Sequence, residues 1–393
     1  MILLKFDVKQ PKVDHGNSGK TAVLGEADKN YLIKWFEKLP TLPSHYCRST
    51  PANQEKKFPE PGTTLNQLHR DYKQAAEDDG SGQKDQCDTC ISAKHGNIDQ
   101  ESYQAHIRAK GEARAEKAKD KETASAKKSV WTLDVQAVLL CPKTKASALY
   151  YKTKLQLHNL SFYNLKSGEG YCYVWDETQG DYKHFSEVLD AHPEIEEIVI
   201  WSDGFTYQNR NTNLANSLLD LAIKCGVKIV QKYLVVGHTQ MEVDSKHATI
   251  ERKLVGDIYI PHDYVVVMES ARLKPSPHVV KQVSHDEVMK LDGSYLSSIR
   301  PGKKTGDPTV YNLWALEFQS TGTVQFKLEI SEKAIWEKLR QRISLPKKPF
   351  SQIRHFKEQL PIKERKYNNL QSMKPVLPTW AHPFYDNLPH HNN

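Results

Sequence analysis

Three acidic residues occupy positions where buried strands and a helix would bring them together. Asp134 interrupts the apolar run WTLDVQAVLL, Asp203 follows the apolar residues 198–201, and Asp244 lies in the segment MEVDSKH. Carboxylates placed side by side repel one another unless cations neutralise them, and hard oxygen ligands suit Mg²⁺ or Mn²⁺. Two such ions about 4 Å apart can activate an attacking oxygen and stabilise the leaving oxygen in phosphodiester chemistry. We therefore predict that these three aspartates are catalytic and hold two divalent ions.

The segment 241–254 offers more than one acid for the third position. If this segment is a helix, residues 244, 247, 248 and 251 share one face. Asp244 lies nearest the sheet end and is the preferred third acid. The other candidates for catalytic or supporting roles here are Glu251, Glu242, His238 and His247. The two histidines could support the ligands or transfer protons, and the alternative is that they are ordinary polar residues near a helix start.

The residues after Asp203 suggest contact with a phosphate. Gln208, Asn209 and Arg210 precede a helical pattern, and the backbone N–H groups at a helix start attract phosphate. We predict that these three side chains position a DNA phosphate. Helix capping is the alternative role for Asn209 or Asn211.

A second basic segment lies far downstream, in the loop SIRPGKKTGDPTV. Its cations are Arg300, Lys303 and Lys304. The loop lacks the GxxxxGK[ST] spacing of a nucleotide-binding loop, so we predict instead that it clamps DNA phosphates, with an exposed basic turn as the alternative. The net charge of +7 over 393 residues suits a polyanion partner.

The sequence CDTC contains a pair of cysteines at metal-ligand spacing, Cys87 and Cys90. Two thiolates and two further ligands could hold a structural Zn²⁺ tetrahedrally. The candidates for the other ligands are His95, His106, His45 and Cys47. The alternative is a pair of ordinary thiols, because the second half of the site lacks a standard spacing.

Strand and helix patterns after residue 128 follow the order β-β-β-α-β-α-β-α. The predicted strands are 131–142, 154–166, 170–177, 194–204 and 227–236. The predicted helices are 182–192, 211–226 with Gly226 as its end, and 241–254. This order is that of the ribonuclease H-like (RNase H-like) α/β fold with a mixed five-stranded sheet. It would place the middle of the first strand, the end of the fourth strand and the last helix side by side.

Changes in composition predict five regions. Residues 1–28 are loosely ordered, and 29–128 form a helical region with helices at 29–39, 63–79 and 99–128. The last of these is long and charged, and we expect a solvated helix rather than a nucleic-acid contact. Residues 129–255 are the catalytic core, and 256–343 form a smaller strand-rich region with a strand in 257–270, a hairpin at 311–330 and a helix at 331–343. Residues 344–393 are a Pro-rich tail.

Composition also excludes some classes of protein. No apolar run approaches the about 18 residues of a membrane span, and the apolar start MILLKFDVK is too short for a signal peptide. Six cysteines in this length do not make a disulfide framework. We therefore expect a reducing compartment, the cytosol or the nucleus.

Four segments resemble a group of transposon-derived proteins whose core is similar to DDE-type transposases. They are DVQAVLLCPKTKASALYYKTKLQLHN, WSDGFTYQNRN, GHTQMEVDSKHATIERKL and SIRPGKKTGDPTV. The resemblance covers roughly residues 30 to 390 and places the acidic triad on Asp134, Asp203 and Asp244. The family has a longer stretch around residues 75–90, where GSG marks a deletion or a joint, and more sequence before SHYCR, where a DNA-end-recognition module is expected.

The resemblance implies an RNase H-like core, Mg²⁺- or Mn²⁺-dependent DNA cleavage and strand transfer, DNA as the partner, and nuclear action. It also implies a homodimer. Two alternatives stay open: a domesticated, inactive DNA-binding protein, and a simple RNase H-like nuclease. Metal-dependent nicking separates the enzyme from the inactive protein, and joining of a cut end to a target separates transposase from nuclease.

Overall fold

The computed structural model describes residues 87–180, 194–204, 209–330, 334–339 and 349–391, with short pieces before residue 87. The chain divides into two units, Met1–Gln86 and Cys87–Asn393. In the first unit, β1 (Thr41–Pro43) pairs antiparallel with β2 (Lys57–Pro59). The candidate sites and the large sheet belong to the second unit.

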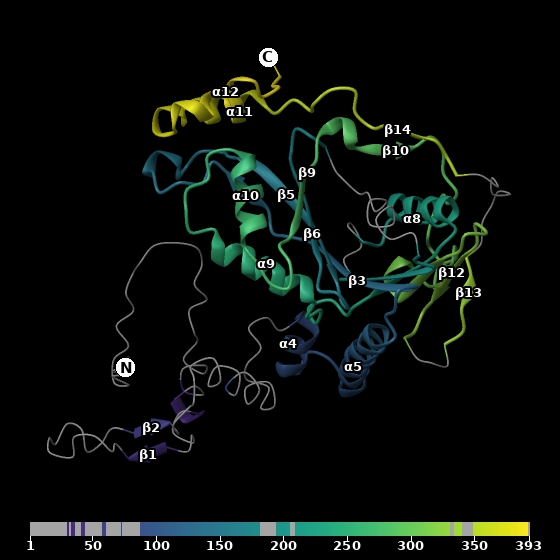
Figure 1. The fold of residues 1–393 in the computed structure, drawn as a ribbon. Coiled ribbons are helices and arrows are strands. Elements are labelled where there is room, and N and C mark those ends of the chain that lie inside the picture. The colour runs from purple at the N-terminus through teal and green to yellow at the C-terminus, as the bar shows by residue number, and fades with distance from the viewer. Residues whose placement is uncertain are drawn as a thin grey trace. The chain divides into compact units, whose positions relative to one another are not determined.

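A ten-stranded mixed sheet organises the second unit (Figure 1). Its strands are β3 (Lys128–Val135), β4 (Leu139–Cys141), β5 (Leu155–Asn164), β6 (Gly170–Asp176), β7 (Glu197–Ser202), β8 (Lys228–Tyr233), β9 (Val279–Gln282), β11 (Ala315–Phe318), β12 (Val324–Lys327) and β13 (Glu337–Lys338). The strand order is β13-β12-β11-β8-β7-β3-β5-β6-β9, and β4 pairs with β5. The chain is therefore mixed α/β.

The centre of the sheet combines parallel and antiparallel neighbours. β3, β7 and β8 run parallel, so their carboxyl ends lie at one edge. β5 is antiparallel to both β3 and β6. The hairpin of β11 and β12 extends the sheet beyond β8 with antiparallel pairing, as the alternation in 311–330 predicts.

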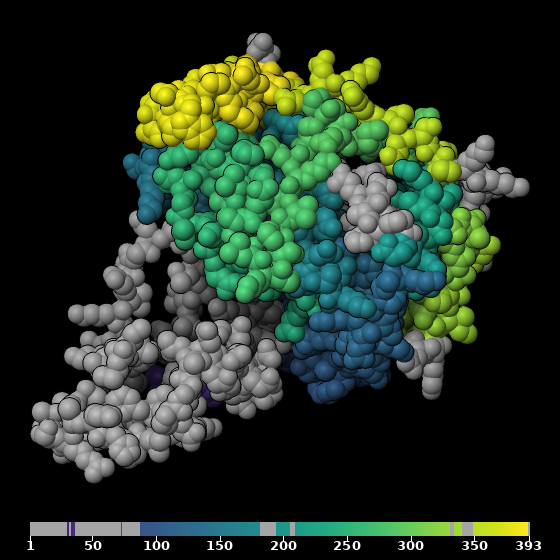
Figure 2. All heavy atoms as spheres, in the orientation of Figure 1, coloured from purple at the N-terminus to yellow at the C-terminus, as the bar shows by residue number. Residues whose placement is uncertain are grey.

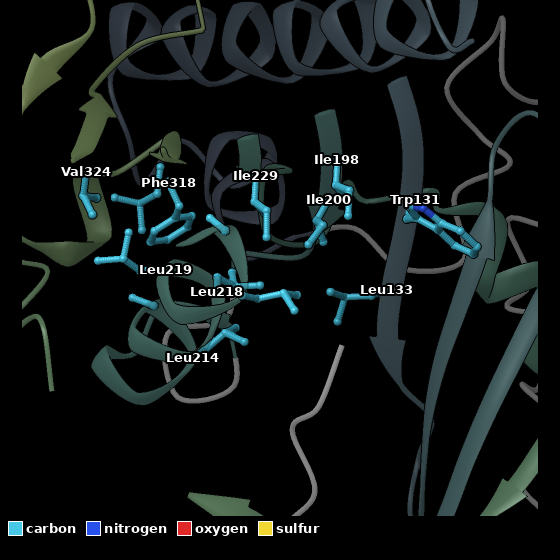
Figure 3. Close-up of a cluster of buried hydrophobic side chains, with 14 of the residues drawn as sticks. Trp131, Leu133, Ile198, Ile200, Leu214, Leu218, Leu219, Ile229, Phe318 and Val324 are labelled. Carbon is cyan, nitrogen blue, oxygen red and sulfur yellow. The ribbon is translucent and has the colours of Figure 1, made fainter. Parts of the chain in front are cut away.

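One face of the sheet is covered by α8 (Thr212–Cys225). Its apolar residues Leu214, Leu218 and Leu219 point toward Ile198 and Ile229 of the sheet (Figure 3). The Asn211 side chain accepts a hydrogen bond from the N–H of Leu214, and Gly226 ends the helix at φ +71°. This confirms the prediction that Gly226 ends the helix. Glycine adopts this positive φ without steric cost because it has no Cβ.

Three helices lie on the other face: α5 (Gln100–Glu122), α9 (Glu242–Lys253) and α10 (Pro261–Ser270). Ala113 of α5 and Val243 of α9 are buried in one cluster with Val130, Val199 and Trp201 of the sheet. Successive residues of a strand point to opposite faces. Asp134 therefore faces the side of α5 and α9, since Leu133 lies in the cluster with α8.

The C-terminal segment 349–391 packs on the same unit. β14 (Gln352–Arg354) pairs with β10 (Met289–Leu291). α11 (Glu364–Gln371) and α12 (His382–Asp386) follow, and Leu370 and Tyr385 are buried with Tyr264 of α10. Figure 2 shows this segment, in yellow, against the green surface of α10.

Two predicted elements are wrong in type. Residues 257–270 were expected to contain a strand, but they contain α10, which starts at Pro261. The Asp263 carboxylate accepts the N–H groups of Tyr259 and Ile260, at 2.7 and 3.1 Å, and caps this helix. In 331–343, a predicted helix, the described residues 334–339 include β13, which pairs with β12.

Other predicted elements differ in extent or lie outside the description. The predicted strand 131–142 is two strands, β3 and β4. The charged helix predicted at 99–128 ends at Glu122. The helix predicted at 182–192 lies outside the described residues, as do most of the helices at 29–39 and 63–79. Within the part of the chain that the structure describes, no helix is both long and apolar enough to cross a membrane.

Candidate metal centres

Asp134 and Asp203 come from neighbouring parallel strands, at the same edge of the sheet. Asp134 is the penultimate residue of β3, and Asp203 directly follows β7. Asp244 is in the first turn of α9, which begins soon after β8 ends. Ligand atoms of Asp134, Asp244 and His247 all lie within 4.8 Å of one another, a spacing that could hold a metal ion.

The charges of neighbouring acids act on Asp134 and on Asp244. Burial raises the pKa of Asp134 to about 7, and the negative charges of Asp203 and Asp244 add to this rise. Loss of hydration also raises the pKa of Asp244, as do the charges of Glu242 and Asp203. A divalent cation would relieve this repulsion.

His247 completes the group on the buried side of α9. Burial, followed by the nearby charge of Lys246, lowers the pKa of His247 to about 4, so its imidazole is neutral near pH 7. Its Nε2 atom is buried and has no hydrogen-bond partner among the described residues. A neutral imidazole with an unpaired nitrogen is a suitable metal ligand. The three side chains therefore fit a divalent ion.

Asp203 is held in place by a neighbouring amide. The Asn209 side-chain N–H donates to the Asp203 carboxylate, and it also approaches the Asp203 carbonyl oxygen at 3.4 Å. Asn209 is buried, so it supports the aspartate rather than a DNA phosphate. The capping alternative belongs to Asn211, whose side chain accepts the N–H of Leu214 at 2.9 Å.

Two of the alternative acids make other contacts. Glu242 pairs with Lys117 of α5 at 2.7 Å. The Glu251 carboxylate accepts a hydrogen bond from Gln136 at 3.4 Å. Neither belongs to the group of ligand atoms around Asp134, and Asp244 is the acid of α9 that does.

We expect Asp134 to make the stability of the protein depend on pH. Its pKa rises from 3.8 to about 7 on folding, so between these values the folded state retains a proton that the unfolded state has lost. Stability contributed by the neutral carboxyl is therefore complete below about pH 4 and is lost as the pH rises through about 7. Without added Mg²⁺ or Mn²⁺, Asp134→Asn should be more stable than the wild type at pH 8 by up to about 4 kcal/mol.

Urea midpoints of both proteins at pH 5 and pH 8 measure this effect. The stability advantage of Asp134→Asn over the wild type should be about 2–3 kcal/mol larger at pH 8 than at pH 5. A difference that is the same at both pH values would show that Asp134 is not forced to ionise in a buried site.

A second group of ligands joins α4 (Asp88–Lys94), α5 and the loop before α9. The Nε2 atom of His238 lies 3.2 Å from the Sγ atoms of both Cys87 and Cys90. The Nε2 atom of His106 lies 3.2 Å from Cys87 Sγ and 3.5 Å from Cys90 Sγ, and the two imidazole nitrogens are 3.1 Å apart. We call these four residues the Cys₂His₂ cluster; they too could hold a metal ion.

The cluster differs from its sequence-based prediction in one ligand. His238, which we expected near the carboxylates, lies here instead. His95 is exposed at the end of α4 and is not part of this group of described residues. His45 and Cys47 lie outside the described residues. No spacing rule points to His238, because it is 151 residues from Cys87.

The imidazoles of the cluster are neutral near pH 7. Burial lowers the pKa of His238 to about 4, with further contributions from Lys110, His106 and Arg114. Burial and Lys110 also lower the pKa of His106. Neutral imidazoles bind metal ions, whereas imidazolium cannot.

Gly237 lets the loop before α9 approach Cys87. Its φ is +75°, and a Cβ there would lie 2.4 Å from the Cys87 Cβ. We expect Gly237→Ala to destabilise the protein by about 2–4 kcal/mol, through backbone strain and overlap with Cys87. The matched control is Gly256→Ala, since a Cβ at Gly256 meets nothing within 4 Å. Equal urea midpoints for the two variants would contradict the close approach.

The predicted DNA contacts fall into two kinds. Arg210 is buried, donates to the Tyr311 carbonyl oxygen at 2.7 Å and stacks 4.5 Å from the Tyr233 ring centre. The phosphate prediction is therefore wrong for Arg210, which packs inside the protein. Gln208 lies outside the described residues.

The loop 298–310 keeps its basic side chains on the surface. Arg300, Lys303 and Lys304 are exposed. The Asp307 carboxylate accepts the backbone N–H groups of Lys303 and Lys304 at 2.9 and 2.8 Å, which shapes the loop. The side chains of these three residues are therefore accessible to a polyanion.

Comparison of this chain with protein-family models, with curated proteins and with solved structures yields no match.

Proposed function

We propose that the chain is a transposase-like enzyme that cuts DNA and transfers strands with divalent metal ions. The observation that carries this proposal is that Asp134 and Asp203 lie at the carboxyl ends of the neighbouring parallel strands β3 and β7, and that the charges of Asp203 and Asp244 both act on Asp134. The approach of Asp134, Asp244 and His247 ligand atoms to within 4.8 Å supports it. So does the pKa of about 7 at Asp134, which marks a carboxylate in need of a counter-charge.

An RNase H-like core is part of the proposal. The strand order β6-β5-β3-β7-β8, with β5 antiparallel and β3, β7 and β8 parallel, is the order expected for that fold. The strands β11, β12 and β13 on one side and β9 on the other would be additions to this core. The sequence resemblance to DDE-type transposases points the same way.

Bound Mg²⁺ or Mn²⁺ would supply charge neutralisation and activation of the attacking oxygen. The protein's own residues hold the carboxylate ligands in place. Asp134 presents its carboxylate from β3, a central strand of the sheet, and Asn209 orients Asp203. Asp244 directs one oxygen to the N–H of Met241 at 2.9 Å, which fixes its direction at the start of α9. The exposed Arg300, Lys303 and Lys304 would meet DNA phosphates, and binding would then weaken with salt.

Zinc is the ion that we propose for the Cys₂His₂ cluster, because two thiolates and two imidazoles in a tetrahedral group suit Zn²⁺. DNA as the partner, action in the nucleus and a homodimer complete the proposal. A domesticated DNA-binding protein with the same basic surface is the second candidate, favoured by the exposed loop 298–310 if the carboxylates hold no metal.

Nicking of supercoiled plasmid DNA tests the proposal. We expect Mg²⁺- or Mn²⁺-dependent nicking by the wild-type protein, and joining of a cut end to target DNA. Nicking without joining would favour a simple nuclease. Salt-sensitive DNA binding without nicking at any metal concentration would favour the domesticated protein.

A further inference from the structure

The Cys₂His₂ cluster connects parts of the chain that are far apart in sequence. Cys87 and Cys90 lie at the start of α4, and His106 lies in α5. His238 is 132 residues beyond His106, in the loop between β8 and α9. An ion held by all four side chains would therefore fix this loop to α4 and α5.

The geometry of the cluster fits a tetrahedral zinc ion. With Zn–S near 2.3 Å and Zn–N near 2.0 Å, a tetrahedron separates sulfur from nitrogen by about 3.5 Å and the two nitrogens by about 3.3 Å. The sulfur–nitrogen distances here are 3.2, 3.2, 3.2 and 3.5 Å, and the nitrogen–nitrogen distance is 3.1 Å. Gly237, next to His238, has no Cβ, and this allows the loop backbone to lie close enough to Cys87 for the four side chains to come together.

The same loop leads directly into the carboxylate site. The N–H of His238 donates to the Val235 carbonyl oxygen at 2.9 Å, which closes a tight turn. Three residues later, Met241 precedes α9 and donates its N–H to Asp244. Only Thr239 and Gln240 therefore separate His238 from Met241, the residue that precedes α9.

A second connection to α5 supports the loop between these two points. Lys117 Nζ donates to the Gln240 carbonyl oxygen at 3.2 Å and pairs with Glu242 at 2.7 Å. α5 itself is tied to β8, because Lys232 pairs with Glu116 and Asp120, each at 2.7 Å. Zinc would add the remaining fixed point, at the turn of the loop.

We propose that a zinc ion in the Cys₂His₂ cluster positions the start of α9, and through it the catalytic ligands Asp244 and His247. His238 is a positioning residue in this scheme. The role in catalysis rests on the proposed metal-dependent function, whereas the effect of zinc on α9 does not. Loss of zinc frees the loop and weakens divalent-ion binding at the carboxylates without removing any of their ligands.

His238→Asn tests this link, with His95→Asn as the matched control because His95 is an exposed histidine outside the cluster. We expect one zinc per chain by elemental mass spectrometry in the wild type and in His95→Asn, and its loss in His238→Asn. Amide hydrogen exchange over residues 241–247 should become at least about tenfold faster in His238→Asn. Mn²⁺ affinity, measured by electron paramagnetic resonance, should fall about 10- to 100-fold.

Wild-type protein treated with a zinc-selective chelator provides a second route if His238→Asn folds poorly. It should show the same faster exchange, and added Zn²⁺ should reverse it. Wild-type protein without zinc, or unchanged exchange over 241–247 after zinc loss, would overturn the inference. If exchange responds to zinc but no Mn²⁺ binds even to the wild type, the positioning of α9 stands and the proposed catalytic function fails.

Discussion

Asp134→Asn should lower the rate of Mg²⁺-dependent DNA nicking by about 1,000-fold, equivalent to about 4 kcal/mol of transition-state stabilisation. Asparagine keeps the shape of the side chain but removes the charge that neutralises the ions. Asp134 lies at the centre of the group, since both Asp203 and Asp244 act on its pKa. Asp203→Asn should have a similar effect. Initial nicking rates at saturating Mg²⁺ measure both.

The controls separate loss of chemistry from loss of structure. Asp257→Asn changes an exposed aspartate between α9 and α10 and should leave the rate unchanged. Glu251→Gln compared with Asp244→Asn identifies the third acid, and we expect the large loss in Asp244→Asn, because Asp244 shares the ligand group with Asp134. DNA binding should persist in all of these variants. Nicking by Asp134→Asn at the wild-type rate would reject the carboxylate site.

The strands that carry the site were predictable because their signals are local. β3 and β7 contain apolar runs that lead into Asp134 and Asp203, β8 lies in the strand pattern VKIVQKYLVV, and the end of α8 at Gly226 follows from one glycine. α10 was not predictable from apolar content, because its run YVVVM has the β-branched residues of a strand. Pro261 and the Asp263 cap determine its helical type, and both signals are weaker in sequence than the valines that follow.

The site was predictable where topology alone brings residues together. Parallel strands place Asp134 and Asp203 at one edge whatever their side-chain contacts. Contacts made by tertiary packing were not predictable. Arg210 looked like a phosphate ligand, yet it is buried on Tyr233. The sequence places His238 near the carboxylates, yet in the structure it lies beside the thiols of Cys87 and Cys90 at α4 and the imidazole of His106 in α5.

The free energy of unfolding of Cys90→Ser should be about 4 kcal/mol lower than that of the wild-type protein. This is the stabilisation that a ligand provides at about a thousandfold excess over its Kd, and serine is a poor ligand for zinc. The loss is large because the cluster closes contacts between α4, α5 and the loop before α9, which are distant in sequence.

Cys225→Ser is the matched control, since Cys225 is an exposed cysteine at the end of α8 and lies outside the cluster. Urea midpoints should fall for Cys90→Ser and stay near the wild-type value for Cys225→Ser. A zinc-selective chelator should lower the midpoint of the wild type and of Cys225→Ser to that of Cys90→Ser, and it should leave Cys90→Ser itself unchanged. If the chelator lowered all three midpoints equally, the stabilising ion would lie somewhere other than between Cys87, Cys90, His106 and His238.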